Sequence, residues 1–299
     1  MLIDTHAHLN FNAYKADADE VIRRSLEQRR RGKKKIYFLR PLDNQVWMIN
    51  VGTNYETSKR AVEIARGHEK GVYAVVGLHP IHLETGLVKI KNDVEEIEVK
   101  AREEEFDYEK YKGLAKSEKV VAIGEIGLDY YYKPKTKRKL ELFKEKQRTV
   151  LGQQLNLAKE SNLPVIFHCR MAHQDLIDFL KENPEIRPEK AVAHGFVGNL
   201  EELQKYLDFG YYIGINGIIF KNIEGIDFGE NIKRTPLDKI LIETDCPYLT
   251  PPPMEGRNEP LYVKYIAEKI ARIKNISFDE VAEITTKNAK KLFKIRASI

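Results

Sequence analysis

The stretch LIDTHAHL, residues 2–9, joins a short apolar run to two histidines that are two positions apart. Side chains at positions i and i+2 of a β-strand point to the same face. A strand here lets His6 and His8 reach one metal ion together, although such pairs also occur in cores and on surfaces without a metal. We expect a strand over Leu2–Leu9 that carries both histidines at its carboxyl end.

Seven more short apolar or β-branched runs follow, and segments with the apolar spacing of a helix lie between them. This alternation is typical of βα units around a parallel sheet. The further predicted strands are Val46–Thr53, Val72–His79, Val120–Leu128, Pro164–Cys169, Lys190–Phe196, Tyr211–Asn216 and Lys239–Asp245. The predicted helices between them include Tyr55–Arg66, Asp93–Lys116, Arg138–Ser161, Gln174–Glu182 and Leu200–Phe209.

Eight such units that close on themselves give a (β/α)8 TIM barrel, an α/β fold. Two segments with helical spacing, Leu261–Ile273 and Phe278–Phe293, follow the last predicted strand, so we expect an extra C-terminal helix beyond the eight units. No Gly/Ser-rich or Pro-rich linker divides the chain. We therefore predict a single domain over residues 1–299.

Composition excludes few functions, but it indicates the kind of environment in which the protein works. The chain has no apolar run of about 18 residues, and its first residues lack the pattern of a signal peptide, so we expect no membrane span and a cytoplasmic location. Its two cysteines, Cys169 and Cys246, are too few for a disulfide framework. The net charge of +5 allows a polyanionic partner but is weak evidence for one.

The densest positive run lies at residues 29–35, where Arg29, Arg30 and Arg31 precede three lysines. Such a run can contact nucleic acid. It joins the first predicted helix to the second strand, however, and these connections lie on the face of a barrel opposite the catalytic face. We interpret the run as a surface loop, with a second nucleic-acid contact as the alternative.

Potential metal ligands end four other predicted runs. Glu125 ends VVAIGE, His168 ends PVIFH, His194 ends AVAH, and Asp245 ends ILIETD. A buried histidine or a capping carboxylate would explain any one of them alone. Together with His6 and His8 they would gather six polar groups in a dry barrel mouth, which would be costly without a cation. The carboxyl ends of the strands are also where barrel enzymes build their active sites. We predict a metal site there.

The motifs IDTHAHL, GLHP, GEIGLDY, FHCR, HGF, ETDCPYL and RNEP, which run from residue 3 to residue 260, resemble in content and order those of the TatD-related DNases. The resemblance implies that His6, His8, Glu125 and Asp245 hold one divalent ion. It also implies that Glu125 bridges to a second ion held by His168 and His194, and that a metal-activated water is the nucleophile. The two ions would be Zn, Mn or Mg, since this mixed ligand set does not select one of them.

Other residues are candidates for roles around these ions. Glu243 precedes Asp245 by two positions and should face the same interior, where it would orient water, shuttle a proton or support the histidines. The candidate catalytic residues are thus Glu125, Glu243 and Asp245. Basic and aromatic groups at the barrel mouth could bind phosphates or stack on bases, and the ones we select for substrate binding are His79, Arg170, Tyr130 and Arg257.

We predict a deoxyribonuclease that cuts phosphodiester bonds in DNA, from an end or in single strands. The expected partner is thus a nucleic acid, and the sequence indicates no protein partner. The alternative is a related metal-dependent hydrolase that acts on another ester or on an amide, such as an amidohydrolase or an aminoacyl-tRNA deacylase. A third hypothesis is a nucleic-acid-binding protein without catalysis. Binding alone has no need of four histidines and two carboxylates at strand ends, so the ligand set argues against it.

Overall fold

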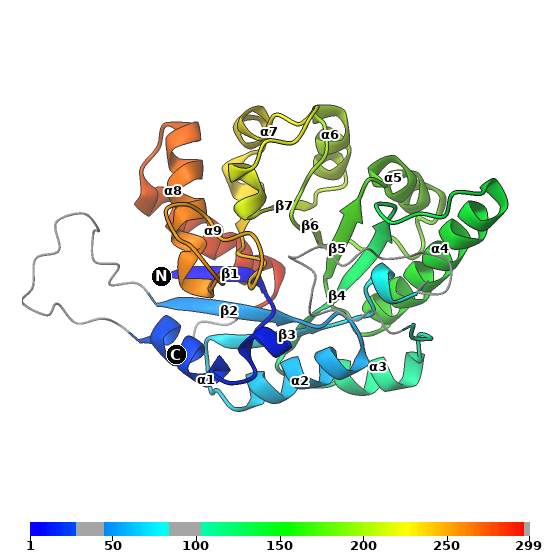
Figure 1. The fold of residues 1–299 in the computed structure, drawn as a ribbon, viewed down its shortest axis with the longest axis horizontal. Helices are drawn as coiled ribbons and strands as arrows, with labels where there is room; N and C mark the ends of the chain where they lie inside the picture. Colours follow the sequence, from blue (N-terminus) through cyan, green and yellow to red (C-terminus); the bar gives the residue numbers. More distant parts are fainter. Residues whose placement is uncertain (28–44, 84–102, 296–299) are drawn as a thin grey trace, which may run out of the picture.

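Eight parallel strands follow one another in chain order around the molecule (Figure 1). The structure is a computed structural model, and it describes residues 1–27, 45–83 and 103–295. The strands are β1 Leu2–Ala7, β2 Val46–Val51, β3 Val72–Val76, β4 Val120–Asp129, β5 Val165–Arg170, β6 Ala191–Ala193, β7 Tyr212–Ile215 and β8 Ile240–Ile242. The predicted (β/α)8 barrel is confirmed.

Helices alternate with the strands and lie outside them (Figure 1). In the described part of the chain, seven α-helices separate the strands: α1 Ala18–Leu26, α2 Tyr55–Arg66, α3 Tyr108–Ala115, α4 Lys137–Glu160, α5 His173–Glu182, α6 Leu200–Asp208 and α7 Phe228–Arg234. After β8 come α8 Val263–Lys274 and α9 Phe278–Leu292, so the extra C-terminal helix is also confirmed. Among the described helices, none is long and apolar enough to cross a membrane.

The helix predicted over Asp93–Lys116 is too long. Residues 103–107 have no regular structure, and α3 begins only at Tyr108, where the side chain of Asp107 accepts the backbone N–H of Lys110 as an N-cap. A capping aspartate satisfies amide groups that a helix start leaves unpaired, so it fixes the beginning of the helix. Residues 93–102 of this prediction, and the basic run at 29–35, lie outside the described residues.

The barrel closes where the first and last strands meet. Ala7 forms a parallel bridge with Cys246, the Asp245 N–H donates to the His6 carbonyl at 2.8 Å, and the His8 N–H donates to the Cys246 carbonyl at 2.9 Å. This seam joins residues that are almost 240 positions apart in sequence. It holds two predicted histidine ligands and a predicted carboxylate ligand at one end of the barrel.

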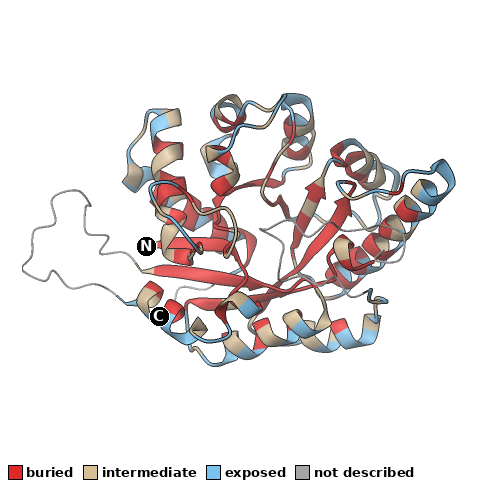
Figure 2. Cartoon of the chain, viewed as in Figure 1, coloured by how far each residue is buried: buried red, intermediate tan, exposed pale blue. Residues whose placement is uncertain are grey.

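Two apolar layers support the barrel. The larger layer joins the outward side chains of the strands to the buried faces of the surrounding helices, which Figure 2 shows as red strips beside pale blue outer surfaces. The smaller layer joins inward strand residues such as Ile3, Val75 and Leu241 to Leu292 and Phe293 at the end of α9. The extra helix therefore covers one end of the barrel interior, and the other end carries the polar side chains.

Strand β1 departs from simple alternation. Ile3 belongs to the inner layer and Ala7 to the outer one, although residues four apart on a regular strand share a face. The pairing of β1 with β2 shifts register between Asp4 and Ala7, which accounts for the change. Asp4, which alternation predicts on the same face as His6, instead accepts the N–H and hydroxyl of Thr244 and so links β1 to the chain after β8.

Strands β3, β6 and β8 each end three residues earlier than predicted, and β1, β2 and β7 end one or two residues earlier. Strand β3 stops at Val76, and His79 caps a short 3-10 turn, Pro80–His82; strand β8 stops at Ile242, before Asp245. Pro80 and Pro247 lie four and five residues beyond these strand ends, so their missing N–H groups keep either ladder from resuming but do not set the last strand residue. Asp245 itself has a left-handed φ of 59°. These turns carry two polar side chains into the barrel mouth.

Candidate metal centre

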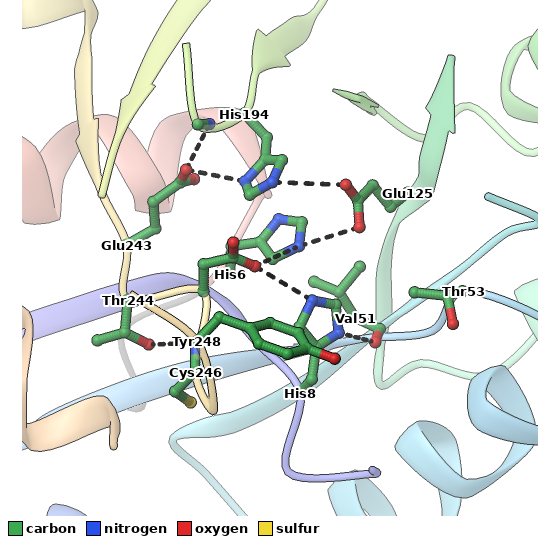
Figure 3. Close-up of polar contacts among 12 residues, drawn as sticks. His6, His8, Val51, Thr53, Glu125, His194, Glu243, Thr244, Cys246 and Tyr248 are labelled. Atoms are coloured by element: carbon green, nitrogen blue, oxygen red, sulfur yellow. Dashed lines mark hydrogen bonds and ion pairs between the residues drawn. The ribbon is translucent and has the colours of Figure 1, made fainter. Parts of the chain in front are cut away.

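Glu125 lies at the centre of the barrel mouth, and its two oxygens face different histidines (Figure 3). Oε2 is 3.3 Å from His6 Nε2. Oε1 is 2.7 Å from His168 Nδ1 and 3.4 Å from His194 Nε2. On the far side of His6, Asp245 Oδ1 is 3.4 Å from His8 Nε2 and 3.9 Å from His6 Nε2. All six predicted ligands therefore converge.

Three of the histidines have outer partners that fix their ring orientation. His8 Nδ1 donates to the Val51 carbonyl at 2.8 Å, because a carbonyl can only accept. His194 Nδ1 lies 2.8 Å from Glu243 Oε1, and His168 Nε2 lies 3.1 Å from Asp129 Oδ2. In each ring the other nitrogen points to the central carboxylates. This is the arrangement in which histidines bind metals, with an outer acceptor that holds the proton away from the ion.

His6 is the histidine that needs a cation most. Its ring is fully buried, its Nδ1 has no hydrogen-bond partner among the described residues, and its Nε2 contacts only carboxylate oxygens, at 3.3 Å from Glu125 and 3.9 Å from Asp245. The ring stacks on that of His194 with 3.6 Å between centroids. A buried polar nitrogen without a partner is costly unless something else satisfies it. Groups suited to a metal ion here are His6, His8 and Asp245; His6, His194 and Glu243; and His79, Glu125 and His168.

The charges of this centre are coupled. Burial opposes a charge on His194, but Glu243 and Glu125 outweigh it and raise the pKa of this histidine to about 10. Burial likewise opposes a charge on His168, and its bonds to Asp129 and Glu125 still raise its pKa to about 9. Without a cation, both rings are therefore positively charged imidazolium groups at neutral pH, with a proton on the inward nitrogen as well as on the outer one. A metal ion must displace that proton from the inward nitrogen.

His79 differs from the four predicted ligands. Its Nδ1 accepts the Ile81 N–H at 2.9 Å, so the proton of the neutral ring lies on Nε2. That Nε2 is 3.6 Å from Glu125 Oε1. Burial, followed by the charge of His168, holds the pKa of His79 well below its usual range. A neutral ring with an inward N–H is a hydrogen-bond donor, which agrees with our interpretation that it contacts a phosphate oxygen.

Glu243 faces away from the open side of the centre. Its Oε1 accepts the Gly195 N–H at 2.6 Å and faces His194 Nδ1, as Figure 3 shows. Its Oε2 fills the space beside Gly214, where a Cβ would lie only 2.6 Å away. The side chain is almost fully buried. This geometry fits the predicted alternative, in which Glu243 supports a histidine, better than a role in proton transfer.

Asp129 is a functional candidate that sequence reasoning missed. It ends β4, four residues after Glu125, and is buried. Its Oδ2 faces His168 Nε2, its Oδ1 accepts the Tyr131 N–H at 2.9 Å, and the Gln147 side chain clamps its backbone N–H and carbonyl at 2.8 and 3.0 Å. The motif GEIGLDY contains it, so the signal was present beside Glu125. Asp129 holds the His168 ring with Nδ1 toward Glu125.

We expect Asp129→Asn to weaken metal binding by about 10- to 100-fold. The amide oxygen can still accept the Tyr131 N–H, but its NH2 group would face His168 Nε2. That contact favours the tautomer with the proton on Nδ1, the nitrogen that faces Glu125. Calorimetric titration with Zn or Mn measures the change, and Asp19→Asn on the exposed surface of α1 is the control. An unchanged affinity would contradict this role.

The predicted substrate-binding residues lie in different environments. Tyr130 is buried with 4% exposure against Phe143 and beneath Lys144, so it does not offer a ring to solvent. Arg257 binds Asp17 through two nitrogens at 2.9 and 2.6 Å and also donates to the Ala13 carbonyl. These bonds brace the loop after β8 against the start of α1. Arg170, by contrast, lies at the end of β5 near the metal centre.

Comparisons with known proteins agree with this geometry. The model of the family described as TatD related DNase matches residues 3–294. The "Uncharacterized metal-dependent hydrolase YabD" of Bacillus subtilis (strain 168) is 38% identical over 297 residues, which cover 99% of this chain and 100% of that protein. A "3'-5' ssDNA/RNA exonuclease TatD" of Pantoea ananatis (strain LMG 20103) is 30% identical over 297 residues, which cover 98% of this chain and 99% of that protein.

A solved structure has the same fold. The crystal structure of YJJV, a TatD homolog from Escherichia coli K12, superposes with a TM-score of 0.75 at 27% sequence identity. The match covers 99% of this chain and 98% of that one. The likeness thus includes every strand that contributes a residue to the metal centre.

Proposed function

The chain belongs to the TatD related DNase family of metal-dependent hydrolases, and we propose that it is a two-metal nuclease that hydrolyses phosphodiester bonds from an end of single-stranded DNA. The observation that carries the proposal is the division of Glu125: one oxygen faces His6 and the other faces His168 and His194. A carboxylate so divided suits a bridge between two cations. The name of the Pantoea ananatis relative supports the substrate class.

Each ion would have its own ligands. His6, His8 and Asp245 would hold one, His168 and His194 the other, and Glu125 both. Bound divalent ions would supply Lewis acidity, which activates water and stabilises the negative charge that develops on the phosphate oxygens. This mixed set of imidazole and carboxylate ligands accepts Zn, Mn or Mg.

The chain's own residues would then orient the substrate and move protons. Asp245 is the best carboxylate to accept a proton from attacking water, because its side chain is 19% exposed whereas that of Glu125 is 5% exposed. The Nε2–H of His79 would donate to a phosphate oxygen. Glu243 and Asp129 are positioning residues that hold His194 and His168 with the ligating nitrogens inward.

The proposal is tested by release of nucleotides from end-labelled single-stranded DNA after metal removal and addition of Mg, Mn or Zn. We expect cleavage with at least one ion, none with EDTA, and a product ladder that reports the direction of digestion. Matched RNA and duplex strands define the preference. If the metal-loaded protein cuts no nucleic acid but hydrolyses a carboxylic ester or an amide, the nuclease proposal is wrong.

A further inference from the structure

Beside the metal centre, the ends of β4 and β5 carry a cluster of aromatic, apolar and basic side chains, two of them exposed and two half-buried. Asp129 of β4 pairs in register with Arg170 of β5, and the Tyr130 N–H donates to the Arg170 carbonyl at 2.9 Å. Arg170 is two residues beyond the ligand His168, or about 7 Å farther along the strand. We call Tyr131, Tyr132, Arg170 and Met171 the tyrosine platform.

The tyrosine platform is tied directly to the ligand shell. Asp129 touches His168 Nε2 with one oxygen and accepts the Tyr131 N–H with the other. The position of Tyr131 is therefore fixed by the same carboxylate that orients the ligand His168. A substrate group that rests on this ring has a defined place relative to the reacting phosphate.

The exposed surfaces of the tyrosine platform suit a flat aromatic ligand. Tyr131 is 46% exposed and Met171 65%, and these are two of the four large apolar side chains that stand out to solvent in the described part of the chain. The Arg170 guanidinium lies 3.5 Å from the centroid of the Tyr131 ring, and the Tyr132 ring meets Tyr131 edge-on at 4.8 Å. Both neighbours hold the Tyr131 ring in place while part of it stays open.

The charge around the tyrosine platform suits a polyanion. Arg170 belongs to the platform, and the exposed Lys133 and Lys135 follow the tyrosines in the same loop. Aromatic rings beside basic side chains are the combination that binds single strands, because every base has a face that can stack and every linkage has a negative charge. An apolar protein partner would gain nothing from these cations.

We propose that the tyrosine platform stacks one base of a single-stranded nucleic acid whose scissile phosphate lies at the metal centre. This inference rests on the proposed nuclease function and adds to it a base-binding subsite. It replaces Tyr130, which is buried, with Tyr131 as the stacking residue. Stacking does not read hydrogen-bonding edges, so the subsite accepts any base and rejects a missing one.

The test compares normal DNA single strands with strands that carry one abasic position, moved stepwise along the first nucleotides from the cleaved end. We expect Tyr131→Ala to raise KM by about 5- to 150-fold on normal strands, the effect of losing one stacked base. On the strand whose abasic position falls at the subsite, wild type and Tyr131→Ala should have the same KM. Tyr131→Phe keeps the ring and should restore discrimination against the abasic strand.

The control is Leu200→Ala, which removes a 43% exposed apolar side chain at the start of α6 and should leave KM unchanged. Circular dichroism and metal content verify that each variant is folded and loaded. If wild type cuts DNA but Tyr131→Ala has the same KM, the platform is wrong and the nuclease function stands. If Tyr131→Ala raises KM equally on every strand, including the strand whose abasic position falls at the subsite, the stacking proposal is also wrong. If wild type cuts no nucleic acid, both proposals fail.

Discussion

Glu125→Gln should lower the single-turnover rate constant for cleavage of single-stranded DNA by about 1000-fold or more. The amide keeps the shape of the carboxylate but removes the charge that faces His6 on one side and His168 and His194 on the other. Metal ions stabilise transition-state charge by several kcal/mol, and each 1.4 kcal/mol is a tenfold change in rate. Losing the group that would bridge both ions should forfeit most of this stabilisation.

The measurement is single-turnover cleavage of end-labelled DNA at saturating metal, with metal content determined for each variant. Glu118→Gln is the matched control, since Glu118 is exposed just before β4, at the opposite end of the strand that carries Glu125. Its rate should equal that of the wild type. A Glu125→Gln variant that retains more than a tenth of the wild-type rate would show that Glu125 does not bridge the ions.

The barrel was predictable because its apolar runs are numerous and regularly spaced. Where the prediction failed, single residues decided the outcome. The left-handed φ of Asp245 turns the chain away after β8, and the Asp107 cap starts α3 late. The register shift in β1 could not be read from the sequence, because no residue in LIDTHAHL marks a bulge as a glycine or proline would.

The candidate ligands were predictable for a different reason. Histidines and carboxylates that follow apolar strands converge at the mouth of a barrel whatever the exact strand lengths. The errors in the predicted strand ends therefore did not affect the predicted set of ligands. The outer partners were harder to predict. The roles of Asp129 and Glu243 depend on which ring nitrogen each histidine turns toward them. Tyr130 is buried whereas its neighbour Tyr131 is exposed. These details follow from packing, not from spacing.

The metal-free protein should lose stability as the pH rises from 7 to 10. His168 and His194 have folded-state pKa values of about 9 and about 10, above the value near 6.5 expected for an unfolded chain. A histidine whose pKa is raised on folding stabilises the folded protein fully at a pH below its unfolded-state pKa. This stabilisation is lost as the pH rises through the folded-state pKa. Each of the two histidines should thus lower the free energy of unfolding by roughly 1.4 kcal/mol for each unit that the pH rises within this window.

Metal binding should remove this dependence. An ion replaces the inward proton of each ring, so the loaded protein has no such proton to lose between pH 7 and 9, and the stabilisation by metal should grow with pH. Urea denaturation with EDTA and with saturating Zn, at one-unit steps of pH, measures the difference. His194→Gln in EDTA should halve the pH slope above pH 8, because one of the two imidazoles is gone and Asp4, whose pKa burial raises to about 8, no longer contributes there. A metal-free protein equally stable at pH 7 and pH 9 would mean that the two rings are neutral without metal, and the centre would then be preformed for cations and not held together by protons.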